Sequence, residues 1–323
     1  MEYTELGLTQ LNVSRICFGT WQFGGDWGAQ EVDENRAAIR RALELGINFF
    51  DTAQGYGWGE SERLLGDTLR DELRSRRDEL VIATKGGLRM DGETLVRDAS
   101  PQWLRQGVDE SLKALGVDHI DLYQVHWPDP DTPSDETAGA LGELVDEGKI
   151  RHVGVSNFDA DEMEAFDATR PVETLQPPYH LFRRDIEDSI LPWCREQDLG
   201  VLVYGPLAHG LLSGKLDAAS TFPDDDWRCG SDLFQGEAFE RNLGVIDELK
   251  AFAAERGWTV PQLAVGWTLA QPGVHAAIVG ARRPDQIEGT AAAADVELTS
   301  DDLAEIDRIM EGAVKVGGPS PEA

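Results

Sequence analysis

The sequence is poor in cysteine and in long apolar runs. Its 323 residues include three scattered cysteines, Cys17, Cys194 and Cys229. An odd number without a spaced motif predicts neither a disulfide framework nor a metal site. No apolar run approaches the ~20 residues that span a bilayer, and the first ten residues, MEYTELGLTQ, show no basic region followed by an apolar stretch. We therefore expect a soluble, cytoplasmic protein.

Positive charge is scarce as well. The chain has 29 basic against 60 acidic residues, a net charge of −31, and only six of the basic residues are lysines. Such a field repels nucleic acid and anionic membranes, so we expect neither as a partner. The acidic residues are spread along the whole chain. This resembles the lysine-poor surfaces of halophile proteins, which work where the Debye length is only roughly 3 Å at 1 M salt.

A glycine-rich stretch, FFDTAQGYGWGESE (49–62), raises the possibility of a dinucleotide-binding loop. The fingerprint needs glycines spaced G-x-G-x-x-G after a strand. Gly55 and Gly57 fit that spacing, but the third position is Glu60, whose carboxylate would repel a pyrophosphate. The stretch is therefore interpreted as a strand ending at Asp51, followed by a flexible turn that carries Tyr56 into the site.

Apolar β-type runs alternate with amphipathic helical stretches. The strands are expected at 15–20, 47–52, 80–85, 120–126, 150–157, 173–176, 200–205 and 275–281. Eight strands that alternate with helices predict a (β/α)₈ TIM barrel of the α/β class, rather than an open sheet. A single domain over 1–323 is expected.

Several segments lie outside this alternation. Residues 1–14 are expected to form a hairpin that could plug the barrel bottom, and 207–236 a long loop after the seventh strand. Extra helices are expected at about 237–256, 260–271 and 300–312, and a loose tail at 313–323.

Ionisable residues end three consecutive strands: Asp51 the second, Lys85 the third and His126 the fourth. A single charged residue at a strand end is most often a surface residue. Three adjacent ones, with Tyr56 in the second loop, meet at the C-terminal rim where barrels of this class carry their active sites. The pattern predicts an active site there.

The segments around these residues resemble the signatures of the aldo-keto reductase superfamily, closest to its bacterial and archaeal general oxidoreductases. They are FFDTAQGYG, IATKGG, DLYQVHWPDP, GKIRHVGVSNF, YGPLAHGLLSGK and IVGARRPDQIE. The resemblance covers nearly the whole chain. It implies a catalytic tetrad of Asp51, Tyr56, Lys85 and His126, and a barrel that binds a nicotinamide cofactor without a Rossmann domain.

The implied chemistry suits each member of the tetrad. Reduction of a carbonyl by hydride transfer leaves an alkoxide that needs a proton, and a phenol with its ordinary pKa of ~10 is a weak acid near neutrality. Lys85 would favour the phenolate form of Tyr56, and Asp51 would hold Lys85 charged and in place. His126 would orient the carbonyl and stabilise the negative charge that develops on it.

The resemblance also implies the cofactor contacts. Ser156, Asn157 and Gln176 would bind the nicotinamide carboxamide, and Tyr204 would stack on its ring. The other implied contacts are Gly19, Thr20, Trp21, Asp51, Gly205, Pro206, Leu207, Leu211, Ser213, Lys215, Gly280, Ala281, Arg282 and Gln286.

Two of these assignments carry a further argument. The alternative for Ser156 and Asn157 is a helix cap for residues 159–168. Arg282 offers a planar cationic fork for a 2′-phosphate, and no strand ends in a carboxylate placed for a ribose diol, so NADP is favoured over NAD. Thr290 stands where relatives commonly carry an asparagine near the adenine.

The substrate pocket is expected around Trp21, Tyr56, His126 and Trp127, although both tryptophans could instead cap the barrel core. The sequence does not choose among aldehydes, ketones and sugars. We also considered a lysine Schiff-base aldolase with Lys85 as nucleophile, and a non-catalytic, redox-sensing nicotinamide-binding protein on the same scaffold. A monomer or small homo-oligomer is expected.

Overall fold

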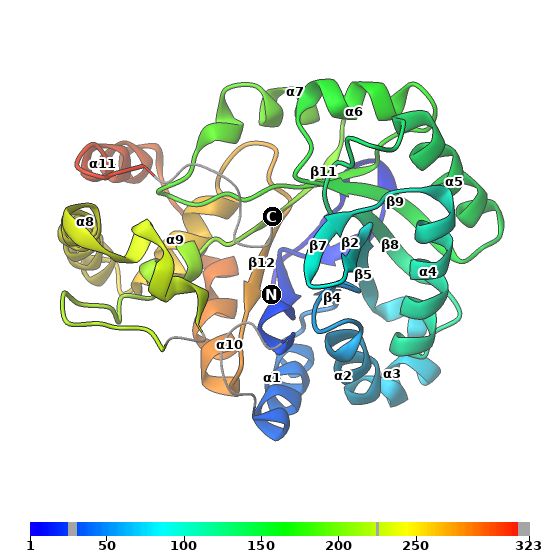
Figure 1. The fold of residues 1–323 in the computed structure, drawn as a ribbon. Helices are drawn as coiled ribbons and strands as arrows, with labels where there is room; N and C mark the ends of the chain where they lie inside the picture. Colours follow the sequence, from blue (N-terminus) through cyan, green and yellow to red (C-terminus); the bar gives the residue numbers. More distant parts are fainter. Residues whose placement is uncertain (25–30, 224–225, 316–323) are drawn as a thin grey trace.

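Eight parallel strands close into a barrel with helices around it (Figure 1). The structure is a computed structural model, and it describes residues 1–24, 31–223 and 226–315. Around the barrel the order is β10, β11, β12, β3, β4, β5, β8 and β9. Their bounds are β3 (Ile16–Gly19), β4 (Phe49–Asp51), β5 (Val81–Gly86), β8 (Ile120–Val125), β9 (Ile150–Ser156), β10 (Thr174–Gln176), β11 (Gly200–Tyr204) and β12 (Ala276–Gly280). All eight predicted strands are present, which confirms the (β/α)₈ fold.

The barrel closes through the pairing of its first and last strands. Ala277 lies opposite Ile16 and Gly280 opposite Gly19, so β12 and β3 run in register. The guanidinium of Arg15, just before β3, adds three hydrogen bonds to the segment that precedes β12, donating to Leu269 O at 2.5 Å, Val274 O at 3.3 Å and His275 O at 3.4 Å. A closed barrel leaves no strand edge unpaired.

The helices form an outer layer around the strands. They are α1 (Val32–Glu44), α2 (Glu60–Thr68), α3 (Arg70–Ser75), α4 (Pro101–Leu115), α5 (Ser134–Asp146), α6 (Ala160–Asp167), α7 (Ile190–Glu196), α8 (Gly236–Glu255), α9 (Val260–Leu269), α10 (Pro284–Ala291) and α11 (Ser300–Met310). Local signals set their ends. In α4, Ser100 caps the first turn by accepting from Trp103 N, Pro101 opens the helix, and Gly116 ends it with a left-handed φ of 68°.

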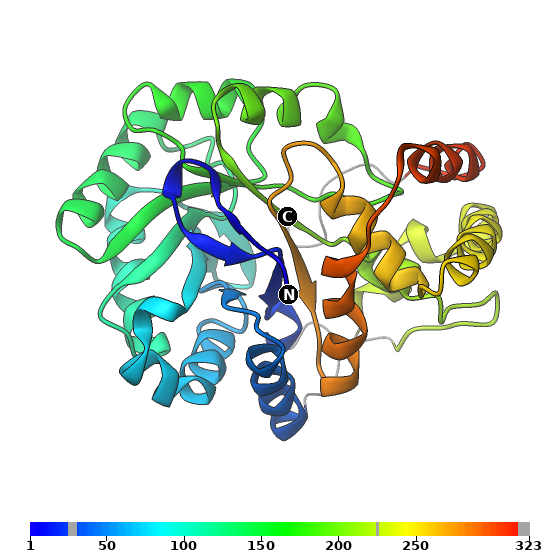
Figure 2. The same ribbon diagram turned by 180° about the vertical axis from the view of Figure 1, so that it is seen from behind.

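The predicted N-terminal hairpin is confirmed and lies at the N-terminal end of the barrel (Figure 2). It consists of β1 (Tyr3–Glu5) and β2 (Asn12–Ser14). Leu6 and Val13 are fully buried among the apolar residues of the barrel interior. Leu8 N donates to Asp198 O at 3.0 Å, just before β11 begins. The hairpin therefore closes this end of the barrel, and the other end carries the site.

A second hairpin, β6 (Leu88–Asp91) with β7 (Thr94–Arg97), was not predicted. It follows β5, and in Figure 1 it lies in front of the barrel opening. Its two-residue turn starts at Gly92, whose φ of 64° glycine adopts without strain.

The predicted long loop after β11 contains short 3₁₀ turns at η5 (Ala208–Ser213), η6 (Trp227–Gly230) and η7 (Asp232–Phe234). A kink at His209 and Gly210, with left-handed φ values of 55° and 100°, divides η5. Most of the predicted loose tail lies outside the described residues. Its first part is bound to α8, since Val314 exchanges two hydrogen bonds with Asn242. None of the described helices combines the length and apolar character needed to cross a membrane.

Candidate active site

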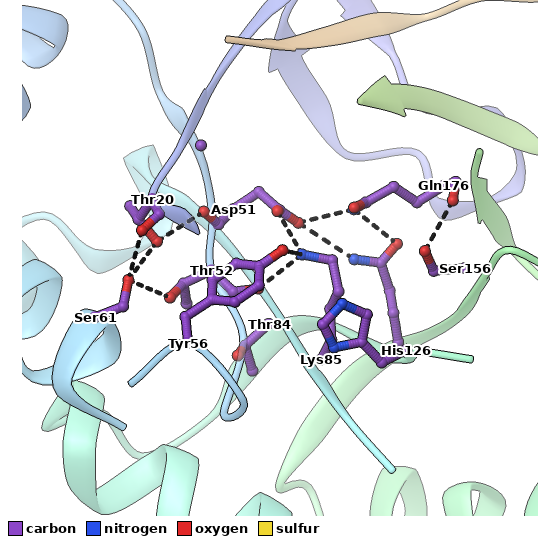
Figure 3. Close-up of polar contacts among 12 residues, drawn as sticks. Thr20, Asp51, Thr52, Tyr56, Ser61, Thr84, Lys85, His126, Ser156 and Gln176 are labelled. Carbon is purple, nitrogen blue, oxygen red and sulfur yellow. Dashed lines mark hydrogen bonds and ion pairs between the residues drawn. The ribbon is translucent and has the colours of Figure 1, made fainter. Parts of the chain in front are cut away.

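Three neighbouring strands bring their charged ends together inside the barrel mouth. Asp51 ends β4, Lys85 lies near the end of β5, and His126 follows β8. All three side chains are buried, with 1 to 2% of each residue exposed. The convergence predicted from the strand ends is present in the structure (Figure 3).

The ammonium group of Lys85 makes three hydrogen bonds. Nζ donates to Asp51 Oδ1 at 2.6 Å, to Thr52 O at 2.9 Å and to the Tyr56 hydroxyl at 3.3 Å. An ammonium has three N–H donors, so these contacts use all of them. The third contact directs a buried positive charge at the phenol oxygen, which stabilises the phenolate relative to the neutral phenol.

Tyr56 is held in place by an unusual turn. Gly57, Trp58 and Gly59 follow it with left-handed φ values of 61°, 52° and 89°. Glycine adopts this conformation freely, whereas a tryptophan there is a strained outlier. The turn reverses the chain directly into α2 and leaves the Tyr56 ring edge-on to His126, with ring centroids 5.7 Å apart and planes at 77°.

The second oxygen of Asp51 accepts hydrogen bonds from two glutamine side chains. Gln176 Nε2 donates at 2.9 Å and Gln124 Nε2 at 3.4 Å. Gln124 was not predicted. The sequence offered a clue, because Gln124 is a polar residue in an apolar strand, two positions before His126 and therefore on the same face of the strand. In the structure it is fully buried.

Asn157 links the residues predicted to bind the cofactor to those predicted to be catalytic. Its Nδ2 donates to His126 O at 3.0 Å, and its Oδ1 accepts from the Tyr204 hydroxyl at 2.9 Å. Ser156 Oγ donates to Gln176 O at 2.8 Å. The helix-cap interpretation of Ser156 and Asn157 is wrong, because Asp159 caps α6.

A cavity of about 450 Å³ extends from Asp51 and Tyr56 to the start of α10. Most of the residues that the family resemblance implied for the cofactor line it: Gly19, Thr20, Trp21, Asp51, Gln176, Tyr204, Gly205, Pro206, Leu207, Ser213, Lys215, Gly280, Ala281, Arg282 and Gln286. Ser156, Asn157 and Leu211 are not among the lining residues, and Leu211 is fully buried in the apolar core.

The loop after β11 adds lining residues that were not predicted. They include His209, Phe222 and Arg228. Arg228 donates to both carboxylate oxygens of Asp226, at 2.9 and 2.6 Å, and its guanidinium lies 4.3 Å from the centre of the Phe222 ring. Burial would raise the pKa of Asp226, but the hydrogen bonds from Arg228 outweigh it and lower that pKa, aided by the charge of Arg282. Arg228 lies in a long loop without a recognisable motif, so its place in the cavity could not be predicted from the sequence.

The two tryptophans predicted for the substrate pocket, Trp21 and Trp127, lie in different places. Trp21 lines the cavity, and its ring stacks on Trp227 with centroids 6.4 Å apart. Trp127 is 8% exposed and does not line the cavity. The guanidinium of Arg97 lies 4.8 Å from the centre of its ring.

Gln286 organises the far end of the cavity. Its Oε1 accepts from Arg282 N at 2.8 Å and from Arg283 N at 3.1 Å. Thr290 does not line the cavity, and its hydroxyl donates to Gln286 O within α10 at 3.1 Å. Among the described residues, no cluster of three or more histidine, cysteine or acidic side chains is arranged to hold a metal ion.

Comparison with known proteins gives one consistent result. The profile of the Aldo/keto reductase family matches residues 15–311. The chain is 42% identical to the aldo-keto reductase YhdN of Bacillus subtilis (strain 168) over 316 residues, which cover 97% of this chain and 95% of the relative. It is 32% identical to the NADH-specific methylglyoxal reductase of Escherichia coli (strain K12) over 319 residues, 94% of this chain and 96% of the relative.

A solved structure agrees with these matches. The glycerol dehydrogenase AKR11B4 from Gluconobacter oxydans superposes with a TM-score of 0.87 at 40% identity, covering 96% of this chain and 95% of that one.

Proposed function

The chain belongs to the Aldo/keto reductase family of oxidoreductases, and from that premise we propose that it interconverts carbonyl compounds and alcohols with NADP(H), using Tyr56 as the acid and base. The carbonyl compounds would be aldehydes, ketones or sugars. The observation that supports this most directly is the contact between Lys85 Nζ and the Tyr56 hydroxyl at 3.3 Å, inside a cavity that extends to Arg282.

The residues of the cavity fit a nicotinamide cofactor. When bound, the cofactor supplies or accepts the hydride. Gln176 would hold its carboxamide, and Tyr204 would pack against its ring. Ser156 and Asn157, which do not line the cavity, would act by positioning Gln176 and Tyr204 through their hydrogen bonds. At the other end, Lys215 and Arg282 line the cavity and would contact its phosphates.

The protein residues would then manage the proton. In the reductive direction Tyr56 donates its hydroxyl proton to the carbonyl oxygen, and the charge left on the phenol is stabilised by Lys85. Asp51 accepts a hydrogen bond from Lys85 at 2.6 Å and balances its charge in this buried setting. His126, edge-on to Tyr56, would donate a hydrogen bond to the same carbonyl oxygen. In the oxidative direction each group acts in reverse.

NADP is preferred in this proposal because Arg282 lies beside Gln286 at the end of the cavity where the adenosine would bind. A guanidinium binds a phosphate through two parallel hydrogen bonds. The relative from Escherichia coli is NADH-specific by name, so the preference is tested below on this chain itself.

The two alternative functions have less support. A Schiff-base lyase needs Lys85 as a neutral nucleophile, but its three donors are engaged and a carboxylate lies at 2.6 Å. A purely regulatory nicotinamide-binding protein would need no assembled acid, and all four tetrad residues are together here.

The test is a screen of NADPH oxidation with aldehydes, ketones and sugars in molar salt, comparing wild type with Tyr56→Phe. The variant keeps the ring and loses one oxygen. General acid catalysis contributes ~10²–10⁴-fold, so turnover should fall by at least two decades while NADPH affinity stays the same. If the variant retains more than about a tenth of wild-type turnover, Tyr56 is not the acid.

A further inference from the structure

The β6–β7 hairpin presents one apolar pair on a defined face. Met90 lies directly opposite Leu95, and Leu88 lies opposite Arg97. Side chains alternate between the two faces of a strand, so Leu88, Met90, Leu95 and Arg97 share one face.

The inner pair of this face contacts both catalytic loops. The Leu88 Cδ1 atom lies 3.6 Å from the position that a Cβ at Gly55 would occupy, next to Tyr56. Arg97 lies over the ring of Trp127, next to His126, and donates to Pro128 O at 3.4 Å. The face therefore borders the site, and Met90 and Leu95 extend it outward.

Met90 and Leu95 are each 43% exposed. Such exposed apolar side chains stand out on a chain with 60 acidic residues. The structure describes six large hydrophobic side chains that are exposed, the others being Tyr3, Leu8, Val32 and Trp58. Of these six, Met90 and Leu95 are the two that face each other in a strand pair. No residue of this hairpin lines the cavity, so Met90 and Leu95 form an apolar surface outside it, on the face that Leu88 continues beside Gly55. An exposed paired apolar surface next to a site is a typical ligand contact, whereas single exposed apolar residues are common.

We propose that Leu88, Met90 and Leu95, here called the hairpin strip, select the substrate by binding an apolar chain attached to the reacting carbonyl. The chemical class is aldehydes or ketones with an extended alkyl or aryl group, in preference to small polyols. This inference rests on the proposed carbonyl reduction. Its physical basis is removal of the strip and of the substrate chain from water, so the gain grows with chain length.

The test measures kcat and KM for straight-chain aldehydes from propanal to octanal. In the wild type, kcat/KM should rise by about two- to fourfold for each added methylene. Twofold corresponds to partial burial of that methylene and fourfold to full burial. The double variant Met90→Ser/Leu95→Ser should flatten the rise, mainly through a higher KM for octanal, and leave propanal unchanged. Leu8→Ser is the matched control, because it removes an apolar side chain of similar exposure (45%) at the opposite end of the barrel.

The outcomes separate this inference from the proposed function. If the double variant keeps the wild-type chain-length dependence, or the wild type shows none, the strip does not select the substrate. If no aldehyde is reduced, the proposed function fails, and the strip is then judged by tryptophan fluorescence titration with 1-octanol and 1-propanol. Tighter binding of octanol that is lost in the double variant supports the strip, and equal affinities overturn it.

Discussion

Lys85 Nζ lies 2.6 Å from Asp51 Oδ1, and at most 3% of either side chain is exposed. Removal of one partner of such a pair leaves a buried charge without its counterion, which typically costs about 3–5 kcal/mol. Lys85→Met and Asp51→Asn should each lower the free energy of unfolding by about that amount. The double variant, which buries no net charge, should be destabilised by less than the sum of the two. Urea unfolding of the three variants checks this, and strict additivity would show that the pair is not coupled.

In the proposed mechanism the same lysine acts in the proton transfer through Tyr56. Lys85→Met should lower carbonyl reduction by at least two decades, comparable to Tyr56→Phe. Combining the two should cost little more than either alone, because both act on one proton transfer. Steady-state turnover of a reactive aldehyde by the single and double variants measures this. Losses that multiply in the double variant would show that the two residues act independently.

Cofactor choice should depend on Arg282. A charge-assisted hydrogen bond contributes ~1.5–3 kcal/mol, or roughly one to two decades in affinity, so NADPH should bind at least tenfold tighter than NADH. Arg282→Ala should remove most of that difference and leave NADH binding nearly unchanged. Arg283→Ala is the control, because Arg283 forms an ion pair with Asp285 at 3.0 Å and does not line the cavity. Titration of the protein's tryptophan fluorescence with each cofactor measures the two affinities. If wild type bound NADPH and NADH equally well, the assignment of Arg282 to the 2′-phosphate would be wrong.

Glu62 should make stability depend on pH. It is 1% exposed, and burial raises its pKa despite a hydrogen bond from Thr84 at 2.6 Å. A carboxyl with a raised folded-state pKa contributes stability below its unfolded pKa of ~4.3, and that contribution is lost as pH rises through the folded pKa. The amide in Glu62→Gln does not ionise, so the variant has no such loss of stability. Its free energy of unfolding should therefore rise relative to that of wild type as the pH increases from the unfolded to the folded pKa of Glu62. Parallel unfolding curves across the window would contradict the expectation.

Salt should stabilise the protein. The net charge of −31 makes the folded chain repel itself at low ionic strength, and the repulsion weakens as the Debye length falls to roughly 3 Å at 1 M. The Tm should rise steadily from ~0.1 M to several molar KCl, as followed by circular dichroism. A flat or falling Tm would remove the basis for regarding the chain as halophilic.

Sequence reasoning located the elements whose signals are local. Each barrel strand is an apolar run bounded by turn residues, and Asp51, Lys85 and His126 are placed by the strand they end. The β6–β7 hairpin was missed because it is short and polar on one face, although Gly92-Glu93 is a two-residue turn of the Gly-X type. Arg228 could not be found, because its place in the cavity depends on how the long loop folds back.

The pairing of β12 with β3 also has a consequence for biosynthesis. These two strands lie near opposite ends of the chain, so the ribosome must release residues 276–280 before the barrel can close. Arg282 and Gln286, which line the far end of the cavity, emerge still later. A nascent chain that already holds Tyr56 and Lys85 therefore has two unpaired strand edges and an incomplete cavity. Because a ligand stabilises only the state that binds it, a molecule bound in this cavity would stabilise the completed protein and not the shorter chains.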